Sequence, residues 1–328
     1  MRYLDFFTTI IDNLLLIYSV LIMFSYAVLL IIAAMSLRRY LKRNRSTDYK
    51  KLITSSLEPA VSVIAPCYNE EGSIVENINA LLELQYNNYQ VIIVNDGSND
   101  NSLEKAIDAY ELEAVHYFIP RQLKTRSIKA VYRSTNKAYY NLLLVDKENG
   151  GKADALNAGI NVSENDYIVC IDVDSIVEPD SLLKLAKPFL EATDKKVIAT
   201  GGVVHVANSC YVENGRLIKR NIPKKLLPRI QVIEYARAFL IGRIAWSKLN
   251  GLLIISGALG MFDKEIVIKA GGYLTSTVGE DMELVVRMRR YMLENKMPHK
   301  VHYIPDPLLW TEVPSDLNTL GRQRNRWT

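Results

Sequence analysis

The feature that most restricts what this chain can form is an uncharged apolar segment near its beginning. Residues 13–37 contain no charged residue and consist mainly of Leu, Ile, Val, Ala and Met. A helix needs about 20 such residues to cross the hydrocarbon core of a bilayer. Asp5 and Asp12 precede the segment, whereas a cleaved signal peptide has positive charge there and a shorter apolar run. The segment predicts an uncleaved membrane anchor, and a buried core helix is the alternative.

Basic residues follow the apolar segment and predict its orientation. They are Arg38, Arg39, Lys42, Arg43, Arg45, Lys50 and Lys51. Because Lys and Arg flank membrane helices on the cytoplasmic side, we expect the rest of the chain in the cytoplasm, attached to the cell (inner) membrane. The predicted divisions are a short extracytoplasmic N-terminus (1–12), the transmembrane anchor (13–37), a basic juxtamembrane linker (38–57) and a cytoplasmic domain (58–328).

From residue 58 onward, short β-rich runs alternate with helical patterns. The expected strands are 61–67, 90–96, 141–146, 166–174, 196–207 and 252–262, and the expected helices are 70–84, 101–111, 152–160, 180–192, 225–248 and 281–295. The strands are almost continuously apolar, as in a sheet that is covered on both faces. The pattern predicts an α/β fold with a doubly wound, mostly parallel sheet and helices on both faces.

Charge and cysteine content exclude several functions. Lys and Arg number 40 against 36 Asp and Glu, and this small excess gives no reason to expect a nucleic-acid partner. The three cysteines lack metal-binding spacing and are expected to be reduced. Two basic segments, 119–137 and 212–229, interrupt the β/α alternation. A solvated or lipid-facing surface explains them, with a substrate role as the alternative.

Polar residues follow the first two predicted strands, at the sheet edge where doubly wound proteins bind ligands. Asn69 and Glu70 come after the first strand, and Asp96 ends the second. A carboxylate there can accept hydrogen bonds from a nucleobase or a ribose. Asp96 precedes a glycine, so ordinary turn chemistry explains it equally well.

A DVD sequence closes the strand predicted over 166–174. Alternation along a strand places Asp172 and Asp174 on the same side. Two neighbouring carboxylates at the end of a buried strand repel each other, and a divalent cation removes that cost. Oxygen ligands without nearby His or Cys favour Mg²⁺ or Mn²⁺ over Zn²⁺.

Three further motifs combine charge with helix ends. Lys152 follows two glycines at a helix start and can present an ammonium to a phosphate. Glu280 and Asp281 begin another helix, where acidic residues also act as simple helix stabilisers; facing the metal site, Asp281 is a candidate general base. Near the C-terminus, Arg326 can bind a diphosphate and Trp327 can stack on a sugar.

The order PCYNE, NDGS, GGKADALN, DVD, GED and QRNRW over residues 58–328 resembles the processive family 2 glycosyltransferases, which include the cellulose, chitin, hyaluronan and poly-N-acetylglucosamine synthases. The resemblance implies a GT-A fold, a UDP-sugar donor, a Mg²⁺ or Mn²⁺ cofactor and inverting transfer. Its third motif reads GED where cellulose synthases commonly have TED, which weakens an assignment to cellulose.

The resemblance also implies roles for individual residues. Asp281 would be the catalytic base with Glu280 beside it, and Asp172 and Asp174 would form the metal site. Gln323, Arg326 and Trp327 match the QxxRW signature, which clamps the donor diphosphate beside the acceptor. The implied nucleotide-sugar-binding set is Asn69, Glu70, Asp96, Lys152, Asp172, Gln323, Arg326 and Trp327.

The sequence therefore predicts a membrane-anchored, inverting, metal-dependent glycosyltransferase that extends a polysaccharide or glycan at the cytoplasmic face. Partner membrane subunits are a further expectation. The synthases continue after the QxxRW signature into interfacial and transmembrane helices that build a polymer channel, so we expect either that this sequence is part of a longer protein or that the enzyme lacks that channel. The alternatives are transfer of a single sugar to a lipid or glycan primer, and a membrane scaffold that keeps the fold without catalysis.

Overall fold

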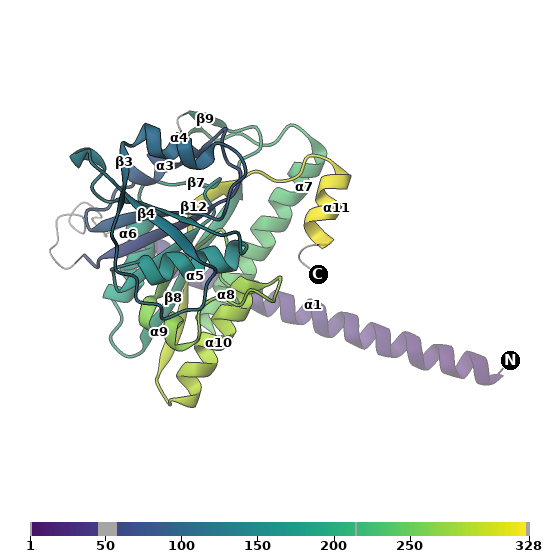
Figure 1. Cartoon of the computed structure of the whole chain (residues 1–328). Coiled ribbons are helices and arrows are strands. Elements are labelled where there is room, and N and C mark those ends of the chain that lie inside the picture. Colours follow the sequence, from purple (N-terminus) through teal and green to yellow (C-terminus); the bar gives the residue numbers. More distant parts are fainter. Residues whose placement is uncertain (1, 45–57, 214, 326–328) are drawn as a thin grey trace.

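The structure is a computed structural model that describes residues 2–44, 58–213 and 215–325. An α/β body carries one long N-terminal helix that extends away from it (Figure 1). The helices are α1 (Arg2–Asn44), α3 (Ile74–Leu82), α4 (Ser102–Ala109), η1 (Lys137–Tyr139), α5 (Lys152–Val162), α6 (Ser181–Leu190), α7 (Leu226–Tyr235), the π-helix η2 (Ala236–Gly242), α8 (Arg243–Lys248), α9 (Lys264–Lys269), α10 (Glu280–Glu294) and α11 (Leu317–Asn325).

The body is built on a ten-stranded sheet in the order β3-β4-β5-β2-β1-β6-β11-β8-β12-β7. Its strands are β1 (Val61–Cys67), β2 (Tyr89–Asn95), β3 (Leu112–Val115), β4 (Ile128–Ser134), β5 (Leu142–Lys147), β6 (Tyr167–Ile171), β7 (Ile176–Val177), β8 (Lys196–Val206), β11 (Leu259–Asp263) and β12 (His299–Thr311). A separate hairpin pairs β9 (Tyr211–Glu213) with β10 (Arg216–Lys219).

The predicted fold class is confirmed, and its parallel part is the centre of the sheet. Strands β5, β2, β1 and β6 are parallel neighbours, so their carboxyl ends share one edge. Farther out the sheet is mixed, because β11 runs antiparallel to β6 and β8, and β4 runs antiparallel to β5. Strand β8 is again parallel to β12.

Two apolar cores lie on opposite faces of the sheet. On one face, Ile64 of β1 and Leu156 of α5 belong to a core that also includes Leu284 of α10. On the other face, Val63 of β1 belongs to a core with Ile78 of α3 and Leu185 of α6. Because both faces are covered, the central strands have no polar side to present, which explains their continuous apolar sequence.

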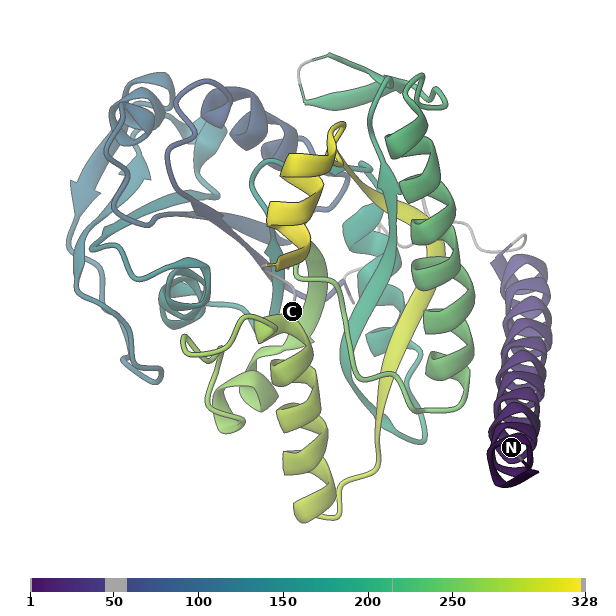
Figure 2. The same ribbon diagram turned by 90° about the vertical axis from the view of Figure 1, so that its right-hand side faces the viewer.

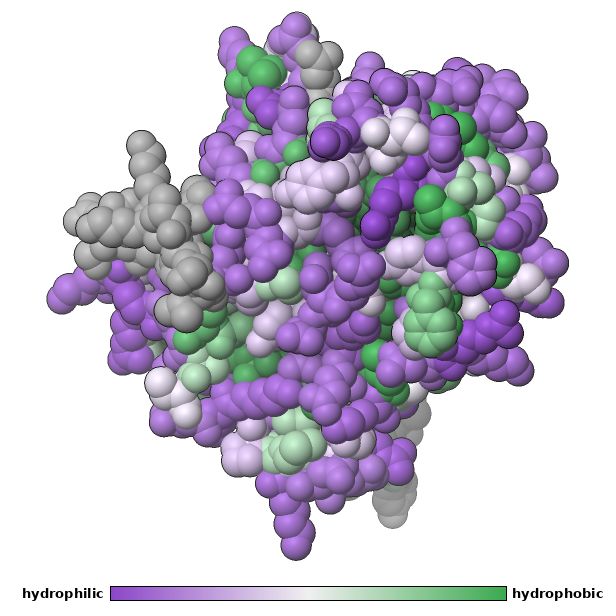
Figure 3. Space-filling view, turned by 60° about the vertical axis from the view of Figure 1, so that its left-hand side comes forward, coloured by the Kyte–Doolittle hydropathy of each residue, from purple (hydrophilic) through white to green (hydrophobic). Residues whose placement is uncertain are grey.

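The first helix is apolar and exposed along most of its length. One helix in the described part of the chain, over Thr9–Asn44, is long and apolar enough to cross a membrane, and its most apolar window has no buried residue. The helix continues through residues 38–44, which the sequence assigns to a linker; residues 45–57 lie outside the described residues. By contrast, the face of the body in Figure 3 is mainly hydrophilic, with hydrophobic residues in scattered patches.

Several elements differ from the sequence-based expectations. The strand expected over 252–262 forms only from Leu259, and the helix expected over 225–248 contains the π-helix η2 in its middle. Strand β12 was not predicted. Each basic segment contains a strand: β4, which is mostly half-buried, lies in the first, and β10, which is mostly exposed, lies in the second.

Close packing of α5 on the sheet positions the start of that helix. A Cβ atom at Gly159 would overlap Cγ2 of Ile64 and lie 3.3 Å from Cγ2 of Val94. Only a glycine lets α5 approach β1 and β2 so closely. At the other end of the helix, Gly151 is the N-cap with φ 84°, a conformation that favours glycine.

We predict that Gly159→Ala lowers the free energy of unfolding by about 1–3 kcal/mol, because overpacking displaces α5 or Ile64. The matched control is Gly321→Ala in helix α11, where a Cβ meets nothing within 4 Å; helix propensity there favours alanine by up to about 1 kcal/mol. Chemical denaturation of both variants checks this. Equal stability of Gly159→Ala and the parent protein would show that the α5 contact is not tight.

Candidate active site

The loops after β1 and β2 are tied together at the carboxyl edge of the parallel strands. The backbone N–H of Asn69 donates to Oγ of Ser98 at 3.0 Å, and the side-chain oxygen of Asn69 accepts from the N–H of Asn99 at 2.9 Å. Asn69 itself has a positive φ of 56°, which asparagine tolerates better than most residues. Glu70 follows, and its carboxylate accepts from Oγ of Ser73 at 2.9 Å.

Lys152 lies at the centre of the candidate site. Its ammonium forms an ion pair with Asp172 and donates to the carbonyl oxygen of Gly257 at 3.2 Å. Burial alone would lower the pKa of Lys152, but the ion pair with Asp172 and the carboxylates of Glu280 and Asp281 outweigh burial and raise it. The lysine therefore stays cationic and offsets the negative charge of three surrounding carboxylates.

The start of α10 brings its two acidic residues to the same place. The Oδ2 atom of Asp281 accepts from the N–H of Gly257 at 2.9 Å, and its Oδ1 atom accepts from the N–H of Met282 at 2.8 Å. Two backbone donors thus fix the orientation of this carboxylate. Burial raises the pKa of Glu280, and the carboxylates of Asp281 and Asp172 add to the effect.

The two aspartates of the DVD sequence lie in a turn after β6, because that strand ends at Ile171. The argument that alternation along a strand places Asp172 and Asp174 on the same side therefore does not apply. They are nevertheless close enough to interact. Loss of hydration raises the pKa of Asp174, and the negative charges of Asp172 and Glu70 raise it further.

The donor chemistry of this turn fits Mg²⁺ or Mn²⁺. Asp172 and Asp174 offer carboxylate oxygens. Burial and then repulsion raise the pKa of Asp174, and a cation would offset both. Within residues 2–44, 58–213 and 215–325, no group of three or more His, Cys, Asp or Glu side chains forms a ready-made metal site. A cation held here would need further oxygen ligands, such as those of a bound diphosphate.

Asp96 is buried, and its carboxylate already has internal partners. It accepts from the N–H groups of Gly150 at 3.0 Å and Gly151 at 2.7 Å, and it pairs with Nζ of Lys147 at 2.5 Å. Asp96 therefore holds the glycine loop that precedes Lys152. Its contact with a nucleobase stays a prediction.

Lys147 is a structural residue of the site that sequence reasoning missed. Its side chain is fully buried between Asp96 and Asp154, with 2.7 Å to the nearer oxygen of Asp154. A buried ammonium needs such partners, and losing one of them costs about 3–5 kcal/mol. The available signal was a lysine two residues after the apolar run 142–145, where a buried strand ends.

The C-terminal motif is only partly described. Gln323 lies in α11, and its side-chain oxygen is buried without a hydrogen-bond partner among the described residues. Helix α11 (yellow) lies in the middle of the view in Figure 2, and its Arg324 pairs with Glu234 of α7 at 2.6 Å. Arg326 and Trp327, which the sequence assigns to donor binding, lie outside the described residues.

The structure thus brings together Lys152, Asp172, Glu280 and Asp281, with Asp174 and Glu70 nearby. The backbone of Gly257 also belongs to this group, because its carbonyl oxygen accepts from Lys152 and its N–H donates to Asp281. The arrangement can place a cation beside a negatively charged ligand, and it presents an oriented carboxylate a short distance away. This combination suits a displacement in which an anionic group leaves and a hydroxyl is deprotonated.

This chain is similar to known proteins over most of its length. A poly-beta-1,6-N-acetyl-D-glucosamine synthase from Staphylococcus aureus is 30% identical over 269 residues, which cover 81% of this chain and 53% of the relative. A synthase of the same name from Staphylococcus epidermidis is 26% identical over 268 residues, with the same shares. The chain therefore spans about half the length of the curated relatives it matches.

A solved structure shows the same fold. It is a mannosyltransferase from Pyrobaculum calidifontis in complex with GDP-Man and Mn²⁺, with a TM-score of 0.54 and 20% identity, covering 92% of this chain and 72% of that one. Two family models also match: one described as glycosyl transferase family group 2, over residues 167–328, and one described as glycosyl transferase family 2, over residues 62–246. Since the latter covers more than half of the 328 residues, this chain belongs to glycosyl transferase family 2.

Proposed function

We propose that this chain is a membrane-anchored, inverting glycosyltransferase that moves a sugar from a UDP-sugar to a growing polysaccharide with the help of Mg²⁺ or Mn²⁺. The main support for the proposal is that Lys152, Asp172 and Asp281 lie close together at the sheet edge where the parallel strands end. The Staphylococcus relatives, named poly-beta-1,6-N-acetyl-D-glucosamine synthases, make UDP-N-acetylglucosamine the first donor to test.

In the proposed reaction, a hydroxyl of the acceptor attacks the anomeric carbon of the donor sugar. The new carbon–oxygen bond forms as the bond from that carbon to the phosphate oxygen breaks, and UDP leaves with the electron pair. Asp281 takes the proton of the attacking hydroxyl. Two backbone N–H groups fix its carboxylate, so an oxygen lone pair remains directed for that transfer.

Stabilisation of the leaving diphosphate is the other requirement. The ammonium of Lys152 can turn from Asp172 towards a phosphate oxygen, because both side chains are about one-third exposed. Asp172 and Asp174 would hold a divalent cation, which neutralises negative charge on the leaving group. We propose that Gln323, Arg326 and Trp327 also bind the diphosphate region of the donor. The nucleoside part of the donor would be bound by Asn69, Glu70 and Asp96.

Membrane attachment is the third part of the proposal. Helix α1 has the length and apolar character to span a bilayer, and its last turn is basic. That end contacts the body: Tyr40 donates a hydrogen bond to Asp306 of β12, and Arg43 pairs with Glu191 at 3.1 Å. By the positive-inside rule the body then faces the cytoplasm, where UDP-sugars would reach it.

We expect Asp281→Asn to lower the rate of sugar transfer by about 10²–10⁴-fold, as is typical when a general base is removed. Donor affinity should change little, because an amide keeps the shape of the side chain. UDP release from a panel of UDP-sugars measures transfer, and calorimetric titration with UDP measures binding. Glu294→Gln, at the exposed end of the same helix, is the control and should keep full activity.

Full activity of Asp281→Asn would exclude its role as the base. The products of the parent protein separate the two enzymatic alternatives: a ladder of lengths indicates polymer extension, and one product indicates transfer of a single sugar to a primer. No UDP release from any donor, with UDP still bound, would favour a non-catalytic scaffold.

We expect Mn²⁺ in the presence of UDP to raise the free energy of unfolding of the parent protein by about 1–3 kcal/mol, by preferential binding to the folded state. Asp174→Asn should lose most of this gain and should be no less stable without metal, because it removes a repelled carboxylate. Asp108→Asn on the exposed face of α4 is the matched control. Thermal unfolding with and without MnCl₂ is the measurement; an equal gain in Asp174→Asn would exclude Asp174 as a metal ligand.

We also expect the full chain to stay in the membrane fraction after extraction at alkaline pH, since a spanning helix resists the removal of peripheral contacts. Replacing Leu21 and Leu29 within α1 by lysine should release the chain or block its insertion, because a charge at the bilayer centre costs roughly 2.5–3.5 kcal/mol. Immunoblots of the membrane and soluble fractions measure this. Extraction of the unaltered chain into the soluble fraction would contradict the anchor.

A further inference from the structure

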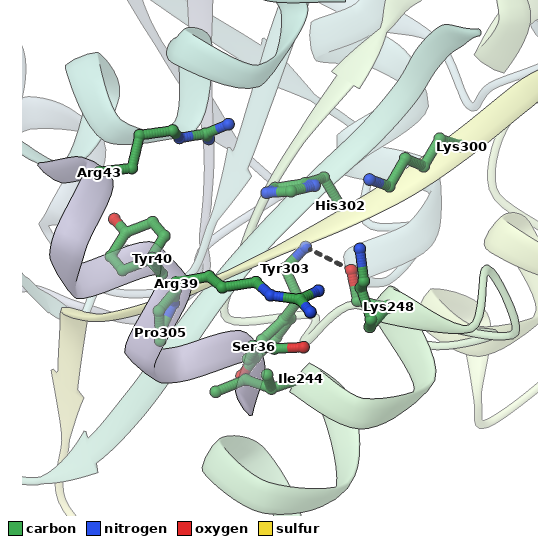
Figure 4. Close-up of a pocket in the computed structure, with 11 residues that line it drawn as sticks. Ser36, Arg39, Tyr40, Arg43, Ile244, Lys248, Lys300, His302, Tyr303 and Pro305 are labelled. Atoms are coloured by element: carbon green, nitrogen blue, oxygen red, sulfur yellow. Dashed lines mark hydrogen bonds between the residues drawn. The ribbon is translucent and has the colours of Figure 1, made fainter. Parts of the chain in front are cut away.

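A polar cavity lies where the end of α1 meets the body, away from the candidate active site. Its volume is about 240 Å³, and it is lined by side chains from α1, α8 and β12 (Figure 4). On β12, Lys300 and His302 pair with Val197 and Thr200, near the start of β8. Since β8 and β12 run parallel to each other, this cavity lies toward the amino ends of these strands, opposite the edge that holds the candidate active site.

The charged side chains around this cavity are mainly cationic. Arg39 and Arg43 extend from α1 towards β12, where Lys300 and His302 face them, and Lys248 approaches from α8 (Figure 4). A neighbouring cavity of about 330 Å³ shares Arg43, Lys248, Lys300 and His302 and adds Lys195. We call the residues Arg39, Arg43, Lys195, Lys248, Lys300 and His302 the basic cluster.

Few carboxylates offset these charges. Arg43 pairs with Glu191, and Asp194 lies on the wall of the neighbouring cavity. No ion pair is found for Arg39, Lys248 or Lys300 within the part of the chain that the structure describes. Burial lowers the pKa of Lys300, and the cations Lys248, Arg43 and Lys195 lower it further. Burial lowers the pKa of His302 to about 4, and the cations Lys300, Arg43 and Lys248 contribute, so His302 is neutral at pH 7 and the other five residues carry the charge of the basic cluster.

A cluster of like charges around a cavity destabilises the folded chain unless an anion joins it. The available donors suit a phosphate group: guanidinium groups bind phosphate oxygens in a bidentate manner, and ammonium groups act as point charges. The cavity wall also includes Ser36, Tyr40 and Tyr303, which adds neutral polar groups.

The position of the cluster indicates where such a phosphate comes from. Arg39 and Arg43 belong to the last turns of α1, directly after the apolar segment that we propose as the membrane span. This is the depth at which lipid headgroups lie. Trp246, which directly precedes the cavity residue Ser247, is 47% exposed, and exposed tryptophans are typical of membrane interfaces.

We propose that the basic cluster binds the phosphate group of an anionic membrane lipid at the junction of α1 and the catalytic body. The lipid would hold the last turn of α1 against β12 and α8 and so fix the distance and tilt of the body above the membrane. The inference that the phosphate belongs to a lipid depends on the proposed membrane anchor. The inference that a phosphate binds depends only on the residues of the cavity.

The test uses the full chain purified in a neutral detergent. Phosphatidylglycerol, phosphatidylcholine and inorganic phosphate are added separately, and native mass spectrometry and thermal unfolding report binding. The test variant is Lys248→Gln with Lys300→Gln. The matched control replaces two exposed lysines elsewhere, Lys124→Gln with Lys219→Gln, and Lys248→Arg with Lys300→Arg retains the charge.

We expect phosphatidylglycerol, but not phosphatidylcholine, to bind and to raise the melting temperature of the parent protein and of the control. The glutamine variant should bind it about 30-fold more weakly, which corresponds to roughly 1 kcal/mol for each of the two lysines. The arginine variant should bind like the parent. Without lipid the glutamine variant should be at least as stable as the parent, because charge repulsion is relieved.

Equal binding of phosphatidylglycerol by the parent and the glutamine variant would overturn the site. An equal rise in melting temperature with inorganic phosphate alone would overturn the lipid source. UDP release is measured on the same samples. A parent that transfers sugar but fails the lipid test disproves only this inference, and a parent that binds lipid but transfers nothing disproves only the proposed function.

Discussion

The ammonium of Lys152 is the group on which the arrangement of the candidate site depends. It joins the start of α5 to the turn after β6 through Asp172, and to the loop before β11 through the carbonyl of Gly257. That loop in turn orients Asp281 through its backbone N–H. Without this cation, the carboxylates of Asp172, Glu280 and Asp281 would repel one another with no offsetting charge. The packing of α5 on β1, and the buried pair of Asp96 and Lys147, keep the lysine in place.

Most of the central fold could be predicted from the sequence, because buried parallel strands are continuously apolar and their helices have a clear period. Strand β12 escaped prediction because its sequence contains Pro305 and Pro307 and the charged Lys300. Its pairing with β8 shifts register on both sides of Pro307, which is how a strand tolerates proline. Strand β4 was hidden in a basic segment because it lies near an exposed edge, where alternate residues are polar.

The site was predicted through its motifs, and the structure shows why motifs alone were incomplete. The residue pairs Lys152–Gly257 and Asp281–Gly257 are separated by 105 and 24 positions, and local patterns do not reveal such contacts. The strand alternation assumed for Asp172 and Asp174 fails because β6 ends before them. The nucleobase contact of Asp96 stays a prediction, and only the fold shows that Lys147 and two backbone N–H groups also bind its carboxylate. The basic cluster combines residues of α1, α8 and β12 with Lys195, which directly precedes β8, and only the fold brings these segments together.

The most direct test of the account is a structure of the full chain with UDP-N-acetylglucosamine and Mn²⁺, in which the distance from Nζ of Lys152 to the nearest diphosphate oxygen is measured. We predict a hydrogen bond of about 2.7–3.2 Å, with Mn²⁺ on Asp172 or Asp174 and the carboxylate of Asp281 on the side of the anomeric carbon opposite the leaving phosphate. A nucleotide bound elsewhere, with the pair of Lys152 and Asp172 undisturbed, would contradict it.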